Sequence, residues 1–333
     1  MTIAPPDINE LRKLSAKLGH DPSLVQAASG NTSIKVGGEL WIKASGKWLA
    51  DASWDEIFVP VDPRTLETSC SKLSPSIETA MHAALPHPVV LHVHSVNAIS
   101  WAVREDGRAR VGEMLAGLCW AWIPYVPSGQ PLACEIQRSR NQATDVFVLA
   151  NHGLVVAGAD CDAAEALLAE VERRLDVAPR EARTPDRVHL SAMARGSGFH
   201  VPSESEVHSL GTDSLSRSIL AAGTIYPCHA LFLGPGTGEC EPFGPVSDAV
   251  ERYEQRYGNR PSIIAVRGKG LLVTDEMSVT QMQVLIGLAQ VIQRIVPDAP
   301  VRYLSEQETA ELLSTDAYRY RDNVEARAAL AAR

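Results

Sequence analysis

Three histidines at two places in the chain have the spacing to hold one metal ion. His92 and His94 are separated by a single residue, and His152 lies further along in an Asn-His-Gly sequence. Side chains two positions apart on a β-strand point to the same face, so the first two imidazoles can reach one ion. A third imidazole would complete a set with open coordination positions, as in catalytic rather than structural metal sites.

Both histidine motifs follow short apolar runs that predict strands. Residues 88–91 read Pro-Val-Val-Leu, and residues 145–149 read Asp-Val-Phe-Val-Leu before the second motif. β-Branched and aromatic residues in such runs favour buried strands. Two alternatives stay open at this point. The His92 and His94 pair is also compatible with a solvated strand face, and His152 with a histidine whose ring is satisfied by backbone carbonyls.

The surrounding segments predict a mixed α/β fold. Residues 30–61 alternate β-type runs with glycine turns, which indicates hairpins. Helices are expected over 8–18, 77–85, 98–103 and 111–117. Residues 153–158 predict a returning hairpin strand, after which Asp160 or Asp162 caps a helix. Its expected apolar face consists of Ala164, Leu167, Leu168, Val171 and Leu175.

The second half of the chain predicts a smaller α/β region. We expect a first domain over 1–180, a linker or excursion over 181–212, and the smaller region over 213–333. Residues 263–273 match the pattern of 146–156, and a helix over 279–295 follows, which suggests a degenerate half-repeat. Lys269 stands where His152 stands, and an ammonium group has no lone pair for a metal. The alternative is that strand-turn-strand-helix units simply look alike.

Composition excludes several classes of protein. The 333 residues carry a net charge of -9, which argues against a nucleic-acid footprint, so we expect small molecules and further copies of the chain as partners. The six cysteines include no Cys-x-x-Cys pair, so neither a thiolate zinc site nor a disulfide framework is indicated. The sequence begins without an apolar signal region and contains no run of transmembrane length, so we expect no membrane partner and a cytoplasmic location.

Five short motifs together resemble the class II aldolase/adducin family. They are Ser-Gly-Asn-Thr-Ser at 29–33, Ser-Gly at 45–46, Ser-Ile-Glu at 76–78, and the two histidine motifs, in the family's order and approximate spacing. Residues 30–35, 40–46, 75–79 and 122–126 look in particular like the aldolase part of bifunctional rhamnulose-1-phosphate aldolase/alcohol dehydrogenases. The resemblance covers about residues 8–178. It implies a class II aldolase-like mixed sheet flanked by helices.

The resemblance implies a metal-dependent aldolase, a carbon–carbon lyase of carbohydrate metabolism. Such an enzyme reversibly cleaves a ketose 1-phosphate, or an analogue, through a metal-bound enediolate, which a divalent cation stabilises as a Lewis acid. Zn²⁺ is the expected ion for an all-imidazole set, with Mn²⁺ and Co²⁺ as alternatives. A homo-oligomer, with a tetramer favoured, is implied as well.

The same resemblance assigns the candidate site residues. The metal ligands are His92, His94 and His152, and Glu78 moves the proton at carbon. Ile77 replaces a serine of the family's Ser-Ser-Glu segment, which removes one hydroxyl from the expected phosphate site. The phosphate is assigned to Gly30, Asn31, Ser45, Gly46 and Ser76. Nearby lysines either add positive charge or are solvated at the surface; they are Lys35, Lys43 and Lys47.

Three other functions fit the same motifs. A sugar-phosphate 4-epimerase uses the same fold and metal, but Glu78 disfavours it because epimerases of the family tend to carry aspartate there. A decarboxylase or dehydratase would work through the same enolate chemistry. An adducin-like binding module is the alternative outside enzymes, and it would have no reason to keep three histidines and a carboxylate.

Overall fold

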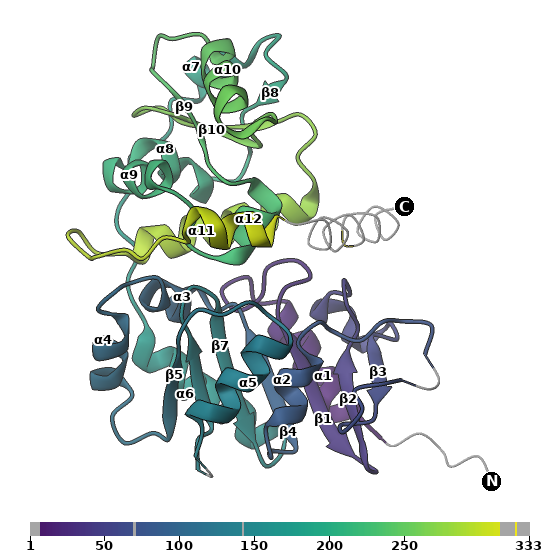
Figure 1. Ribbon diagram of the computed structural model, residues 1–333. Coiled ribbons are helices and arrows are strands. Elements are labelled where there is room, and N and C mark those ends of the chain that lie inside the picture. The colour runs from purple at the N-terminus through teal and green to yellow at the C-terminus, as the bar shows by residue number, and fades with distance from the viewer. Residues whose placement is uncertain (1–6, 69–70, 142, 314–323, 325–333) are drawn as a thin grey trace. The chain divides into compact units, whose positions relative to one another are not determined.

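The computed structural model describes residues 7–68, 71–141, 143–313 and residue 324 (Figure 1). The chain divides into two compact units. The first contains residues up to 102 and 107–176, and the second contains 103–106 and the residues from 177 onward. The fold is mixed α/β, with a seven-stranded mixed sheet flanked by helices in the first unit and a smaller sheet in the second. Among the described residues, no helix has the length and apolar character needed to cross a membrane.

The first unit is built on a sheet in the strand order β3-β2-β1-β4-β7-β6-β5. Every neighbouring pair is antiparallel except β5 and β6, which are parallel. The strands are β1 (Asn31–Val36), β2 (Glu39–Lys43), β3 (Phe58–Val61), β4 (Val89–Val93), β5 (Trp120–Ile123), β6 (Val146–Leu149) and β7 (Gly153–Gly158). The helices are α1 (Asn9–Gly19), the 3₁₀ helix η1 (Leu49–Ser53), α2 (Thr79–Ala84), α3 (Val96–Ala102), α4 (Gly107–Met114), α5 (Gln130–Ser139) and α6 (Cys161–Leu175).

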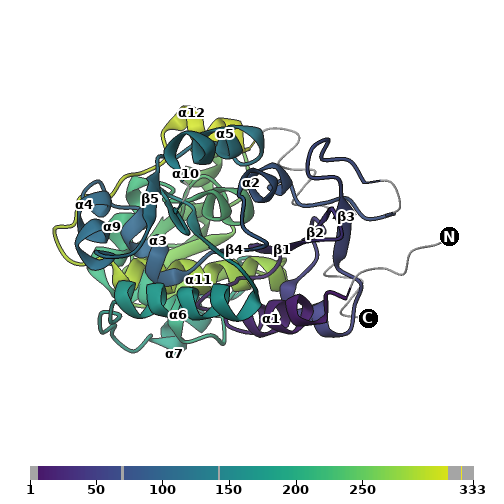
Figure 2. The same ribbon diagram turned by 90° about the horizontal axis from the view of Figure 1, so that it is seen from below.

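Apolar layers cover both faces of this sheet, which is why its central strands read as continuous apolar runs. Leu91 of β4 belongs to the core that contains residues of α1, α3 and α6. Val90, on the opposite face, belongs to the core with residues of α2 and α5. Figure 2 shows α1 and α6 on one side of the strands and α2 and α5 on the other. Because side chains alternate along a strand, His92 shares the face of Val90 and points toward the α2 side.

The helix after the second histidine motif forms as predicted. The Asp160 side chain accepts a hydrogen bond from the Ala163 backbone N–H at 2.8 Å and caps α6. Four of the five residues of the predicted apolar face are buried, and Leu167 is partly buried against the same core. The helix predicted over 111–117 is shifted: α4 spans Gly107–Met114. Gly117 has φ of 87°, a left-handed conformation that ends a helix.

The second unit has a four-stranded sheet in the order β8-β11-β10-β9. Residues 181–212 supply α7, β8 and α8, and β8 pairs with β11, so this segment contributes elements to the unit. Its strands are β8 (Phe199–His200), β9 (Gly238–Cys240), β10 (Ile263–Val266) and β11 (Gly270–Thr274). Its helices are α7 (Arg187–Ala194), the 3₁₀ helix η2 (Glu206–His208), α8 (Ser209–Thr212), α9 (Ser214–Ala222), the π-helix η3 (His229–Leu233), α10 (Val246–Tyr257), α11 (Val279–Arg294) and α12 (Glu306–Leu312).

A carboxyl group in α6 gives the protein a pH-dependent stability. Glu172 accepts a hydrogen bond from Asn97 Nδ2 at 3.2 Å, and burial raises the pKa of Glu172 to about 7. The folded state therefore favours the protonated form. The resulting stabilisation is complete below the ordinary pKa of 4.5 and is lost as the pH rises to about 7.

We expect Glu172→Gln to stabilise the protein above pH 7 by about 1–3 kcal/mol, because the amide keeps the size and never ionises. Near pH 4.5 its effect should vanish. Urea midpoints at pH 5 and pH 8 measure the difference, with Glu165→Gln on the same helix as the control. Equal changes at both pH values in Glu172→Gln would contradict the assignment.

Candidate metal centre

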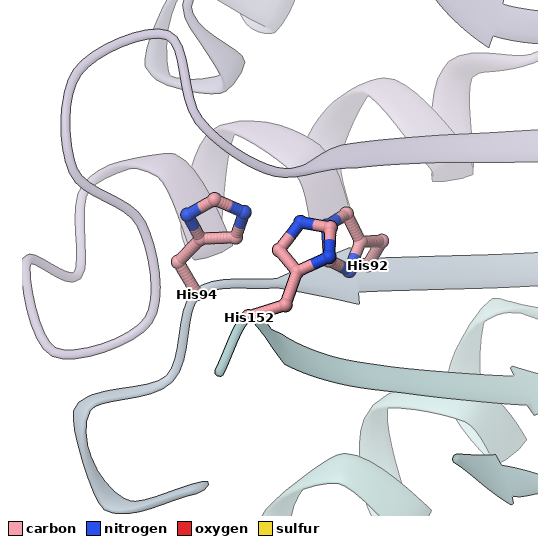
Figure 3. Close-up of side chains that lie close together, drawn as sticks. All are labelled: His92, His94 and His152. Atoms are coloured by element: carbon pink, nitrogen blue, oxygen red, sulfur yellow. The ribbon is translucent and has the colours of Figure 1, made fainter. Parts of the chain in front are cut away.

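The sheet brings the two histidine motifs together. His92 lies on β4, His94 follows directly after this strand, and His152 lies in the turn between β6 and β7. Strand β7 pairs antiparallel with β4, so the turn that precedes β7 lies beside the end of β4. The three side chains are buried, with residue exposures of 0%, 6% and 6% in chain order. Figure 3 shows their rings gathered in one place.

The Asn-His-Gly sequence fits the backbone of this turn. Asn151 has φ of 52°, a left-handed conformation that asparagine tolerates better than most residues with a side chain. A Cβ on Gly153 would lie 2.6 Å from the Val93 carbonyl oxygen. Only glycine therefore lets the start of β7 approach the end of β4 this closely. The turn thus places His152 against the pair on β4.

The three imidazoles form a nearly equilateral cluster. Ring centroids are 5.1 Å apart for His92 and His94, 5.0 Å for His92 and His152, and 5.2 Å for His94 and His152. One ring nitrogen from each histidine lies within 4.8 Å of the corresponding nitrogens of the other two. Three nitrogens this close can bind one ion after small movements of the rings.

The protonation of the rings suits a metal. The Leu154 carbonyl oxygen lies 3.1 Å from His92 Nδ1, so Nδ1 carries the proton and Nε2 presents its lone pair. His92 Nε2 is buried and has no hydrogen-bond partner among the described residues. Burial lowers the pKa of His152 to about 4 and that of His94 well below its ordinary value. Two imidazoles that burial keeps neutral, beside a third whose buried Nε2 has no hydrogen-bond partner among the described residues, form a donor set that suits a divalent transition metal.

Glu78 is the carboxylate beside this cluster. It precedes α2, it is 5% exposed, and its Oε2 lies 3.3 Å from His92 Nε2 while its Oε1 lies 3.4 Å from His152 Nε2. Asn31 Nδ2 donates to Oε2 at 2.8 Å, and Ser128 Oγ donates to Oε1 at 3.2 Å. Burial by itself raises the pKa of Glu78, but the attraction of the neighbouring histidines when they carry a proton, together with the Asn31 hydrogen bond, outweighs burial and holds this pKa below its ordinary value.

A buried relay fixes the Asn31 side chain behind Glu78. Burial lowers the pKa of His82 to about 3, so its ring is neutral. His82 Nε2 contacts Asn31 Oδ1, which can only accept, so Nε2 is the donor and Nδ1 accepts from Ser33 Oγ at 2.7 Å. This arrangement turns the Asn31 amide N–H₂ toward Glu78. The relay holds the carboxylate in its ionised form and in one orientation.

The segments assigned to the phosphate lie around Glu78. Asn31 pairs with His92 in the sheet, and a Cβ on Gly30 would lie 2.7 Å from the His92 carbonyl oxygen. Ser76 is 8% exposed, and its Oγ accepts from the Glu78 backbone N–H at 3.2 Å. The Ser45 backbone N–H donates to the Ser74 carbonyl at 2.9 Å, which places the Ser-Gly turn at 45–46 beside the segment 74–76.

Lys43 holds two of these segments together. It is buried, so the interpretation of Lys43 as a solvated surface lysine is wrong. It is 2% exposed, and its Nζ donates to the carbonyl oxygens of Ala28 at 2.6 Å and Lys47 at 2.8 Å. Burial lowers the pKa of Lys43 to about 7. The other two lysines also bind neighbours: Lys35 Nζ donates to the His87 carbonyl at 3.1 Å, and Lys47 pairs with Asp55.

Sequence reasoning missed three residues that organise the site. Ser33, His82 and Ser128 make the hydrogen bonds behind and beside Glu78. His82 follows Glu78 by four positions, and residues at this spacing share one face of a helix. This spacing was a signal that His82 lies beside Glu78. Ser128 lies in the loop before α5, and only the folded chain brings it to the carboxylate.

A family model and a curated relative are similar to the first unit of the chain. The family model described as Class II Aldolase and Adducin N-terminal domain matches residues 9–178. A curated relative, the uncharacterized oxidoreductase YuxG of Bacillus subtilis (strain 168), is 30% identical over 185 residues, which are 46% of this chain and 27% of that protein. The chain therefore spans about a quarter of the length of this relative.

Two solved structures are similar to about half of this chain. One is the N-terminal class II aldolase domain of a protein from Thermoplasma acidophilum, with 25% identity, 53% of this chain and 94% of that chain covered, and a TM-score of 0.46. Another is L-fuculose-1-phosphate aldolase from Thermus thermophilus, with 17% identity, 50% and 89% covered, and a TM-score of 0.39.

Proposed function

Because the chain belongs to the class II aldolase and adducin family, we propose that it is a divalent-metal-dependent aldolase. Its reaction is the reversible cleavage of a ketose 1-phosphate, or a close analogue, into dihydroxyacetone phosphate and an aldehyde. The observation that carries this proposal is the cluster of three buried histidines with an ionised, oriented carboxylate directly beside it. A binding module without chemistry has no need for this costly buried arrangement.

The residues of the site divide the work of an aldol cleavage. His92, His94 and His152 would hold the metal, preferably Zn²⁺, which supplies Lewis-acid stabilisation of the charge that develops on the substrate oxygens. Glu78 exchanges a proton with the carbon atom that is the nucleophile in the synthetic direction. Asn31 and Ser128 keep the carboxylate oxygens oriented toward the histidines.

The phosphate would bind beside Glu78. Gly30, Asn31, Ser45, Gly46 and Ser76 belong to segments that the structure holds around that residue. Turns with glycine let backbone N–H groups approach an oxyanion, and short hydroxyls add further donors. Lys43 holds the segments at Ala28 and Lys47 in place and brings a buried amine near them. Ile77, 56% exposed, takes the place of the further hydroxyl that the family motif offers.

The test of the function needs no knowledge of the aldehyde. The metal-loaded protein should exchange a carbon-bound proton of dihydroxyacetone phosphate with deuterated water, which proton NMR follows directly. Exchange that depends on added zinc supports the proposal. Absence of exchange in protein that has bound metal would contradict it.

The homo-oligomer implied by the family resemblance, with a tetramer favoured, stays a prediction. Sedimentation velocity at micromolar concentration measures it. A single species with the mass of one chain, 36.0 kDa, would contradict it.

A further inference from the structure

The second unit repeats the topology of half of the first. The sheet order β8-β11-β10-β9 matches β4-β7-β6-β5, with the same parallel and antiparallel pairs. In both series a strand is followed by helices, a second strand, a crossing helix, a hairpin and a final helix. Equivalent hairpins have loops of equal length, with a left-handed residue at the same place, Asn151 in one and Gly268 in the other.

The hydrogen bonds of the two loops also correspond. Ala150 N–H donates to the Ile123 carbonyl at 2.9 Å, and Arg267 N–H donates to the Cys240 carbonyl at 3.0 Å. The loop residue that precedes the final strand is His152 in the first unit and Lys269 in the second, where Nζ pairs with Asp186 Oδ2 at 2.8 Å. Among the described residues of the second unit, the metal position therefore has no counterpart.

The two units differ at another equivalent position, on the parallel strand pairs β5/β6 and β9/β10, where the second unit has a cavity. In the first unit Trp122 of β5 lies beside Val148 of β6, and a Cβ on Gly107 of α4 would lie 3.0 Å from its ring. The equivalent pair in the second unit is Glu239 beside Ala265. A charged side chain and a methyl group thus stand where the first unit has the side chains of a tryptophan and a valine. A cavity of about 410 Å³ lies there, lined by Arg217, Glu239, Cys240, Glu241, Arg252, Ala265 and Arg267.

The charges of this cavity favour an anion. Its lining holds three arginines and two glutamates, a formal charge of +1 in a chain whose net charge is -9. Arg267 pairs with Glu241 at 2.8 Å, while Arg252 Nη2 donates at 2.8 Å to a neutral acceptor, the Glu239 carbonyl oxygen. Arg217 Nε is buried and has no acceptor among the described residues. A buried guanidinium nitrogen without an acceptor is costly unless a ligand supplies one.

The place of the cavity in the fold is a common ligand site. Strands β9 and β10 form a parallel pair joined by α10, and Figure 1 shows these elements in the second unit. Glu241 and Arg267 lie directly after the carboxyl ends of the two strands. Ligands of α/β sheets bind preferentially at such ends. The volume is in the range of pockets for small molecules.

We propose that this cavity binds the phosphate group of a small phosphorylated molecule. Guanidinium groups recognise phosphate through paired N–H donors, and Arg217 and Arg252 have donors that no residue of the described chain uses. The two glutamates lie where they can accept hydrogen bonds from hydroxyl groups of the same molecule. The site lies in the second unit, and its test is independent of the aldolase reaction.

Calorimetric titration of the full chain with inorganic phosphate and with glucose 6-phosphate tests the proposal at fixed, low ionic strength. Arg217→Gln should weaken one binding event at least about tenfold, because a charge-assisted hydrogen bond is lost. Arg252→Gln is a second variant at an exposed position and should act in the same direction. Arg195→Gln, at the end of α7, is the matched control and should bind as the unmodified chain does.

Glu241→Gln provides a test of sign. It removes the competing partner of Arg267, so phosphate should bind more tightly, an effect that a structural role for the arginines would not produce. Equal affinity for both probes would assign recognition to the phosphate group alone. Tighter binding of glucose 6-phosphate than of inorganic phosphate would show that the glutamates also take part, by accepting hydrogen bonds from its hydroxyl groups. Absence of binding in the unmodified chain, or unchanged binding in both arginine variants, would overturn the proposal.

Discussion

Replacing Glu78 with glutamine should slow proton exchange at dihydroxyacetone phosphate by about two to four orders of magnitude, the usual contribution of a positioned acid or base. Glutamine keeps the size of the side chain but has no basic carboxylate oxygen. Its amide nitrogen would also replace one of the two oxygens, so either the hydrogen bond from Asn31 or the one from Ser128 loses its acceptor. Substrate affinity should change much less than the rate.

Proton NMR of the exchange in deuterated water measures this effect in parallel with the unmodified protein. Ser128→Ala is the matched control, because it removes one donor to Oε1 and leaves the carboxylate and Asn31 in place. Its exchange should fall far less than that of Glu78→Gln. Zinc content should be the same in all three proteins. Equal exchange in Glu78→Gln and the unmodified protein would remove Glu78 from the mechanism.

The local pattern of the sequence was enough to predict the elements that carry the histidines. Helices cover both faces of the sheet, so its central strands need apolar residues at every position. The apolar runs before His92 and His152 reflect this need and predicted the strands. The helix capped by Asp160 followed from the helical spacing of the apolar residues on its one buried face. These features depend on near neighbours in the chain, so sequence alone reveals them.

The support of Glu78 depends on distant parts of the chain, and sequence reasoning could not supply it. Asn31 reaches Glu78 across the sheet, and Ser128 reaches it from the loop before α5. Lys43 shows the same limitation. A lysine in a hairpin is usually solvated, but its chain position gives no sign that two backbone carbonyls will enclose its ammonium group.

Removing one imidazole should abolish tight metal binding. His94→Ala leaves two histidines for the metal, and affinity should fall by at least about a hundredfold, because even the loss of outer partners of ligands costs about 10–100-fold. The fold should stay cooperative, since His94 follows β4 and the alanine removes a buried polar ring without breaking a strand. After dialysis, elemental analysis should find close to one zinc per unmodified chain and very little in the variant.

His200→Ala is the control for His94→Ala, because it also removes one histidine but lies at an exposed position on strand β8 of the second unit. Its zinc content should equal that of the unmodified chain. Thermal melting gives a second readout. An ion at about a hundred times its dissociation constant stabilises the protein that binds it by about 2.7 kcal/mol. Zinc should therefore raise the melting temperature of the unmodified chain and of His200→Ala but not of His94→Ala. If His94→Ala retained zinc and its thermal shift, the metal would lie elsewhere, and the aldolase mechanism would lose its Lewis acid.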